Sequence, residues 1–149
     1  MKRRYAGVLL LAGALMAAAL TGCGGSKSFK DGTYEGKSSV YEGEEDGSGA
    51  GYGVAKVTIS GGKITGCEFQ TFEPDGTLKG PDYGKQNGEI ANQDFYNKAQ
   101  RAVQASTKYG EQLAEAGNLA DVDAISGATI SFNEFNEAVN DALDQASGK

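Results

Sequence analysis

Nine consecutive residues near the C-terminal end of the chain combine small side chains with hydroxyl groups. Residues 123–131 read Asp-Ala-Ile-Ser-Gly-Ala-Thr-Ile-Ser. Gly127 and Ala128 are the two smallest residues side by side, so another group can approach the backbone there without meeting a large side chain. Thr129 presents a hydroxyl directly after them, between Ser126 and Ser131. These residue types in this order favour close contact with a polar ligand.

The residues that follow predict a helix with this stretch at its N-terminus. Apolar residues recur there at the spacing of an amphipathic helix, at Phe135, Ala138, Val139, Ala142 and Leu143. Ser131 and Glu134 have the S-x-x-E spacing of a capping box, in which each side chain satisfies an unpaired backbone N–H. Because free N–H groups and the helix dipole suit negative charge, these residues predict a phosphate-bearing ligand near Thr129.

The pattern Asp-x-x-Ser-Gly-Ala-Thr-x-Ser before an amphipathic helix resembles the flavinylation motif of the FMN-binding domain family. That family includes the FMN-carrying subunits of sodium-pumping and ion-translocating bacterial respiratory complexes, and small extracytoplasmic flavoproteins. The resemblance implies that Thr129 becomes joined to the phosphate of FMN by a phosphoester bond. It also implies a maturation partner, a magnesium-dependent flavin transferase that uses FAD as donor. The other motif positions expected to bind the cofactor are Asp123, Ile125, Ser126, Gly127 and Ala128. A polar loop with an ordinary N-cap serine is the alternative.

The first residues of the chain predict a bacterial lipoprotein signal peptide. Three basic residues at positions 2–4 precede an unbroken apolar run over residues 6–20, which is too short for a comfortable membrane span. Leu20-Thr21-Gly22-Cys23 then resembles a lipobox, which implies cleavage after residue 22 and diacylation of Cys23. Lipid chains on Cys23 would hold the protein at the outer face of a bacterial membrane. An ordinary signal peptide with an incidental cysteine is the alternative.

The composition argues against several classes of function. Three of the 14 basic residues and none of the 20 acidic ones lie in residues 1–22, so residues 23–149 keep 11 basic residues and a net charge of −9. A body this acidic does not favour nucleic acid as a partner. The chain has no histidine, which removes histidine-based triads, His-ligated metals and the commonest general base. Redox work in this protein would therefore need an organic cofactor.

Alternation and turn residues predict the first half of the domain. Residues 23–30 form a Gly/Ser/Lys tether, and the domain itself is expected over residues 31–149. Residues 52–60 alternate apolar and polar side chains, and Gly61-Gly62 turns the chain into a returning strand over residues 63–72. Cys67 in that strand is expected to be a small buried residue rather than a redox thiol.

Helical spacing predicts the second half. Residues 92–106 carry one apolar stripe, at Phe95, Ala99, Ala102 and Val103. Residues 107–116 continue or restart this helix, and Gly117 ends it. With the helix after Thr129, these elements predict a single α+β domain, a small antiparallel sheet with helices packed on one side.

The polar segment between the second strand of the hairpin and the first helix is expected to be a loop. Lys79 and Tyr83 lie in it, in a stretch that resembles small members of the family. We hypothesise that Tyr83 faces the isoalloxazine ring and Lys79 the phosphate. A plain surface loop is the alternative.

These features predict a membrane-anchored extracytoplasmic electron carrier with covalent FMN, in preference to a stand-alone enzyme. Its expected partners are the flavin transferase, a membrane or extracytoplasmic redox protein, and the membrane itself through the lipid anchor. No second group of residues suited to activating an organic substrate stands out. Two other classes stay open: a flavin-dependent reductase with its own substrate, and a lipid-anchored ligand-binding or interaction protein with reversible or no FMN.

Overall fold

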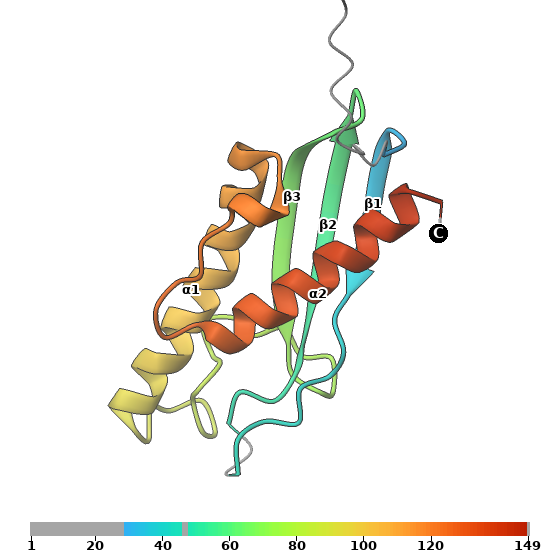
Figure 1. Ribbon diagram of the computed structural model, residues 1–149. Helices are drawn as coiled ribbons and strands as arrows, with labels where there is room; N and C mark the ends of the chain where they lie inside the picture. Colours follow the sequence, from blue (N-terminus) through green and yellow to red (C-terminus); the bar gives the residue numbers. More distant parts are fainter. Residues whose placement is uncertain (1–28, 46–47, 149) are drawn as a thin grey trace, which may run out of the picture.

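The computed structural model describes residues 29–45 and 48–148, and shows a three-stranded antiparallel sheet with two long helices on one face (Figure 1). The strands are β1 (Gly32–Lys37), β2 (Tyr52–Ser60) and β3 (Lys63–Phe72), in the order β1-β2-β3. The helices are α1 (Gln93–Ala116) and α2 (Thr129–Ala146), with the short 3-10 helix η1 (Leu119–Asp121) between them. This is the predicted α+β architecture.

The predicted signal peptide, Cys23 and the tether up to residue 28 lie outside the described residues. Across residues 29–45 and 48–148, no helix is both long enough and apolar enough to cross a membrane.

The β2–β3 hairpin confirms the prediction from alternation. Every second residue of β2 is at most 2% exposed, namely Ala55, Val57 and Ile59. The polar residues between them face solvent on the other side of the sheet. Gly61 and Gly62 at the turn both have positive φ, 61° and 73°, as a two-residue type I′ turn requires. The sheet therefore offers one apolar face, and the helices cover it.

Each helix approaches the sheet at a glycine. A Cβ atom at Gly36 in β1 would overlap the Ala138 carbonyl oxygen of α2. A Cβ atom at Gly110 in α1 would lie 2.8 Å from the Cys67 carbonyl oxygen of β3. Since no side chain fits either space, these two glycines set how closely the helices pack. As a result α2 crosses β1 and β2 while α1 runs along β3 (Figure 1).

The core lies between the helices and the sheet and is centred on aromatic rings. Its largest fully buried side chains are Val57, Tyr109, Leu113, Phe135 and Val139. The Phe135 ring stacks on Tyr109 at 5.4 Å between centroids and meets Phe69 edge-on at 5.1 Å. Cys67 is a half-buried free thiol, and burial raises its pKa to about 12, which leaves it unreactive near neutral pH.

α1 is one continuous helix, so residues 107–116 continue the helix rather than restart it. At its start the Asn92 side-chain oxygen accepts a hydrogen bond from the Phe95 N–H at 3.0 Å. At its end Gly117 adopts φ 68° and donates its N–H to the Leu113 carbonyl at 2.8 Å. Both ends of α1 are thus capped: Gly117 was predicted to end the helix, whereas the cap by Asn92 is a finding of the structure.

Candidate functional site

Helix α2 begins at Thr129, and the predicted capping box is wrong. Ser131 is buried within the first turn, and Glu134 is buried on the second turn rather than reaching back to the helix start. Ala128 occupies the cap position, with φ −131° and ψ 35°, and no side chain caps the helix. The physical reason is packing: α2 turns the side of Ser131, Glu134 and Phe135 inward, so these residues are not free to cap its end.

The first turn of α2 consequently keeps three unpaired backbone N–H groups. Within the described part of the chain, those of Thr129, Ile130 and Ser131 have no hydrogen-bond acceptor. The first paired one belongs to Phe132, which donates to the Ala128 carbonyl at 3.0 Å. The Thr129 side chain is exposed at this position. An uncapped helix start with an accessible hydroxyl is a suitable place for a phosphate group.

Tyr109 holds the loop before α2 in place. Its hydroxyl accepts a hydrogen bond from the Ile125 N–H at 3.0 Å and lies 3.2 Å from the Ala128 carbonyl, to which it donates. The Asp123 N–H donates to the Gln112 side chain at 2.9 Å, so α1 supports the loop at two points. The sequence shows Tyr109 only as another residue in a helix, and its role as a support was missed.

Gly127 completes this loop through its backbone conformation. It has φ 79°, in the left-handed region that favours glycine. No atom lies within 4 Å of a Cβ built there, so conformation rather than space accounts for the glycine. The small residue therefore lets the chain turn sharply from the motif into α2.

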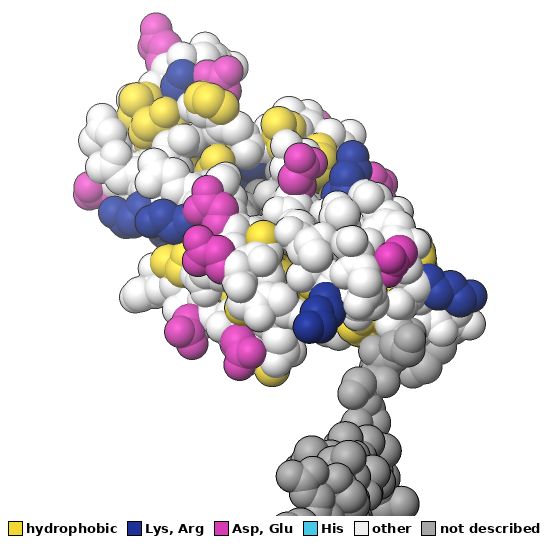
Figure 2. All heavy atoms as spheres, turned by 90° about the horizontal axis from the view of Figure 1, so that it is seen from above, with side chains coloured by type: hydrophobic (Ala, Val, Ile, Leu, Met, Phe, Trp, Pro, Cys, Tyr) yellow, Lys and Arg dark blue, Asp and Glu magenta, His cyan; other side chains and the backbone are white. Residues whose placement is uncertain are grey.

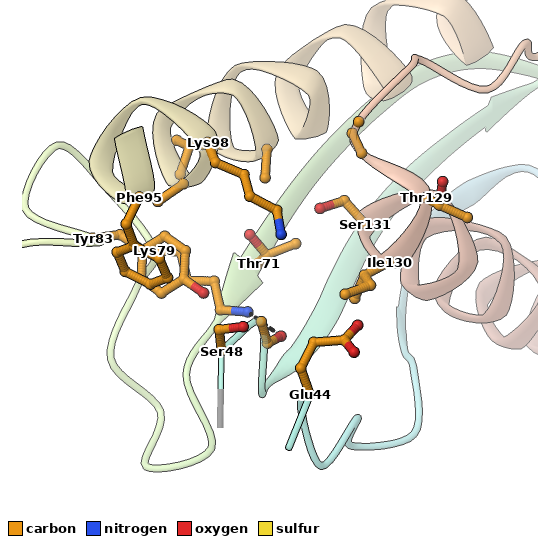
Figure 3. A pocket seen from close by; sticks show the side chains of 16 residues that line it. Glu44, Ser48, Thr71, Lys79, Tyr83, Phe95, Lys98, Thr129, Ile130 and Ser131 are labelled. Atoms are coloured by element: carbon orange, nitrogen blue, oxygen red, sulfur yellow. Dashed lines mark hydrogen bonds between the residues drawn. The ribbon is translucent and has the colours of Figure 1, made fainter. Parts of the chain in front are cut away.

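A cavity of about 280 Å³ opens between the first half of α1, the start of α2 and the end of β3 (Figure 3). Its apolar wall includes Phe95, Ala99, Ala102, Val103 and Ile130. Four of these form the apolar stripe of α1, of which only Ala99 is fully buried, so the stripe lines the cavity rather than filling the core. Its polar groups include the side chains of Thr71, Lys79, Lys98, Thr129 and Ser131. Lys98 extends from α1 toward Thr71 (Figure 3).

Lys79 and Tyr83 line the same cavity, close together on its far side from Thr129 (Figure 3). Lys79 is 7% exposed; its Nζ donates to the Gly49 carbonyl at 3.1 Å and lies 5.1 Å from the centre of the Tyr83 ring. Burial lowers the pKa of the Lys79 ammonium and raises that of the Tyr83 phenol. The loop thus brings a buried cation and an aromatic ring to the cavity.

The structure brings together five of the eight predicted cofactor-binding residues. Those that line the cavity are Lys79, Tyr83, Gly127, Ala128 and Thr129. Asp123 and Ser126 are exposed outside it, and Ile125 packs against the core. Phe95, Lys98 and Thr71 line it without having been predicted as site residues. Their only sequence signal is position on an amphipathic element, which does not distinguish a cavity wall from a core contact.

The cavity suits an elongated ligand with an aromatic part and an anionic end. A second hollow of about 620 Å³ adjoins it, and the two share Ser48, Gly49, Tyr83 and Phe95 as lining residues. Apolar walls accommodate a planar ring, the free N–H groups of α2 accommodate a phosphate, and Lys79 and Lys98 add positive charge to the cavity. The residues present therefore fit a flavin mononucleotide, the group that the motif implies.

The molecular surface carries charges of both signs. On the face shown in Figure 2, acidic side chains are scattered among neutral ones, and basic side chains occur in small separate groups. This face has no extended basic track of the kind that follows a nucleic-acid backbone.

Comparisons with known proteins agree with this assignment. The fold is similar to that of the CPE2226 protein from Clostridium perfringens, whose crystal structure aligns with a TM-score of 0.56 and 21% identity over 80% of this chain and 90% of that one. Comparison with curated proteins gives no match. The profile of the FMN-binding domain family matches residues 50–144, from the start of β2 into the last turns of α2. The chain therefore belongs to the FMN-binding domain family, and FMN is its cofactor.

Proposed function

We propose that this protein is an electron carrier that holds FMN covalently through a phosphoester on Thr129. The observation that carries the proposal is the uncapped start of α2, which places three free N–H groups and an exposed hydroxyl at the edge of an apolar cavity. When bound there, FMN supplies one- and two-electron chemistry.

The proposed roles of the residues follow from their positions. The free N–H groups of Thr129, Ile130 and Ser131 would bind phosphate oxygens, and the positive end of the helix dipole favours that charge. Lys79, in the loop, and Lys98, on α1, would add positive charge to the cavity and so favour an anionic ligand. Tyr83 and the apolar residues of α1 would contact the ring and exclude water from it.

The attachment step is a phosphoryl transfer onto Thr129. The threonine Oγ1 forms a bond with the FMN-side phosphorus of FAD, the pyrophosphate bond breaks, and AMP leaves. The hydroxyl proton passes to a base of the transferase, and the transferase holds the magnesium. Nothing is oxidised or reduced in this step. The exposed position of Thr129 supports it, since another enzyme must reach the hydroxyl.

A carrier is favoured over a reductase with its own substrate because the chain lacks the usual acid–base residue. It contains no histidine, and among the described residues the cavity lining holds one carboxylate, the exposed Glu44, rather than a pair of carboxyl groups. We propose further that lipid on Cys23 holds the carrier at the outer face of a bacterial membrane. There it would receive electrons from a membrane or extracytoplasmic donor.

Intact mass tests the attachment directly. The protein is purified from cells with and without a co-expressed flavin transferase, beside the variants Thr129→Ala, Ser126→Ala and Ser131→Ala. The expected gain is one FMN less one water, present only with the transferase, lost in Thr129→Ala and kept in the two serine variants. No gain in the wild-type protein under any condition would contradict the covalent link.

Two further measurements separate the remaining alternatives. Steady turnover of a single donor and acceptor pair without a partner protein would indicate a reductase rather than a carrier. A Cys23→Ala variant that still fractionates with membranes would contradict the lipid anchor. If no mass is gained but added FMN binds reversibly, the alternative of a reversible flavin-binding protein replaces the proposal.

A further inference from the structure

Helix α2 carries a buried carboxyl group that the proposed attachment does not use. Glu134 is 4% exposed, and its Oε1 has neither solvent nor a hydrogen-bond partner in the described part of the chain. A Cβ atom built at Gly53 would lie 3.1 Å from the Glu134 Cβ and 2.5 Å from the Phe69 ring, so the Glu134 side chain starts from a closely packed contact between α2 and the sheet. An unpaired carboxylate in such surroundings is unfavourable, and it needs an explanation.

The charged groups around Glu134 come from the adjacent loop and from α2 itself. Lys79 attracts its charge, while Glu137 on the next turn repels it. The electrostatic influence of Glu134 also reaches Tyr83, and Glu73 acts on both Lys79 and Tyr83. On α1, Lys98 lines the cavity. On the sheet, the uncharged residues Gly53 and Phe69 pack at this part of α2.

Lys79 does not neutralise Glu134 by direct contact. Its Nζ donates to the Gly49 carbonyl instead, and no ion pair joins the two side chains among the described residues. Burial raises the pKa of Glu134 to about 7, with Lys79 lowering it and Glu137 raising it. The Glu134 carboxyl group is therefore able to change its protonation near neutral pH. It interacts electrostatically with Lys79, and Lys79 lines the cavity.

We propose that Glu134 takes up a proton from solvent when the flavin in the cavity is reduced. This inference rests on the proposed function, because it requires FMN beside Lys79. An electron arrives from an external one-electron donor, and negative charge increases in the cavity. A proton from water then binds a carboxylate oxygen of Glu134, forming an O–H bond. One electron and one proton enter, so the net charge of the protein does not change.

The physical basis is electrostatic coupling between the reduced flavin and the Glu134 carboxylate, because both negative charges interact with the Lys79 ammonium group. Extra negative charge in the cavity raises the free energy of the Glu134 carboxylate and favours its protonated form. The coupling is reciprocal, so an ionised Glu134 must also make reduction of the flavin harder. Glu134 thus affects the midpoint potential of the flavin through its electrostatic interaction with Lys79, without contact with the reacting atoms.

The first test compares midpoint potentials across pH in the full chain loaded with FMN. Glu134→Gln removes the charge with little change in shape, and Glu44→Gln is the matched control, since Glu44 is an exposed carboxylate at the same cavity. We expect the Glu134→Gln potential to be more positive than wild type at pH 8.5 and to converge with it at pH 5.5. Any offset of the Glu44→Gln potential from wild type should be the same at both pH values. A Glu134→Gln difference that is likewise constant, or absent, overturns the proposal.

The intact mass of each protein is measured before its potential, to show that FMN is attached. This order separates a failure of the proposed function from a failure of the role proposed for Glu134. Protein without FMN contradicts the proposed function, whereas loaded protein with no pH-dependent difference contradicts only the role of Glu134.

The second test reads the carboxyl group itself by infrared spectroscopy. Without flavin, the wild-type chain should show a protonated carboxyl band at pH 6 that disappears above pH 8 and is absent from Glu134→Gln. In loaded protein at pH 7.5 the same band should grow on reduction. If Glu134→Gln does not fold, the wild-type bands decide. No band at pH 6, or a band that ignores reduction, overturns the proposal.

Discussion

The N-terminus of α1 and the N-terminus of α2 differ in how their backbone N–H groups are satisfied. At α1 the Asn92 side chain accepts from Phe95, so the chain itself pairs one N–H group of the first turn. At α2 the cap position holds Ala128, and no side chain reaches the free N–H groups of the first turn. Both helix starts border the cavity, through Phe95 and through Thr129, but only α2 lacks a side-chain cap there.

The difference matters because an uncapped helix start lowers the free energy of unfolding, and a bound ligand can restore the missing hydrogen bonds. Capping residues contribute about 1 kcal/mol to a helix, and alanine contributes nothing of this kind. Position 128 holds an alanine that is 4% exposed and packs in the core, and its methyl group leaves the N–H groups available to an anion. Each prediction below changes one side of this comparison.

The largest effect on FMN attachment is expected when α2 is given a cap of its own. Ala128→Asp should place a carboxylate over the free N–H groups and repel phosphate, lowering FMN attachment at least about tenfold, the equivalent of ~1.4 kcal/mol. Ala128→Asn is the control of equal size, which caps without charge and should lower attachment less. The measurement is the flavinylated fraction by intact mass after equal expression times. A folded Asp variant that loads fully would refute the role of the open helix start.

The largest effect on stability is expected when the support of the α2 start is removed. Tyr109→Phe keeps the ring and leaves the Ile125 N–H and the Ala128 carbonyl without their partner. The free energy of unfolding should fall by on the order of 2–3 kcal/mol, because buried groups lose hydrogen bonds. Urea unfolding measures it. Tyr96→Phe is the matched control, since its hydroxyl bonds the Pro81 carbonyl at the surface, and it should cost less than about 1 kcal/mol. Equal losses in both variants would remove the special role of Tyr109.

The two helices also differ in their buried faces. That of α2 carries the carboxyl group of Glu134, whereas that of α1 carries no carboxylate. The pKa of Glu134 is about 7 in the folded protein and 4.5 as a free side chain, so the folded state binds the proton more tightly between these values. Stability should therefore fall as pH rises from about 4.5 to about 7, by on the order of 2 kcal/mol.

Glu134→Gln should lack this decline, and the difference between variant and wild type should grow across the same pH range in the variant's favour. Urea unfolding at pH 4.5, 6 and 8 without flavin measures it. Parallel curves for the two proteins would mean that Glu134 ionises at its ordinary pKa.

The smallest effect is expected at the closed helix start. Asn92→Ala removes the cap of α1 and should lower the free energy of unfolding by about 1 kcal/mol. FMN attachment should not change, because Thr129 and the first turn of α2 are untouched. Urea unfolding and intact mass test the two parts. A loss of attachment without a loss of stability would show that Asn92, which lines the neighbouring hollow, takes part in flavin binding.

Much of the site could be predicted because its chemistry lies in one continuous stretch. The motif around Thr129 is local in sequence, and so are the hairpin and the cap of α1, each of which depends on neighbours along the chain. The start of α2 could not be predicted in the same way. Ser131 and Glu134 have the spacing of a capping box, but they lie on the side of the helix that packs inward, and burial prevents them from capping.

The sequence by itself therefore determined the α+β elements, the motif and, through it, the family and its cofactor. Tertiary structure decided which residues meet at the cavity, since Lys79 and Thr129 lie 50 positions apart and are joined only by the packing of a loop and a helix. It also decided that the apolar stripe at the start of α1 forms a wall, and that Glu134 is buried rather than a cap. The physical reason is that spacing fixes which face a side chain occupies, while burial depends on what the rest of the chain places against that face.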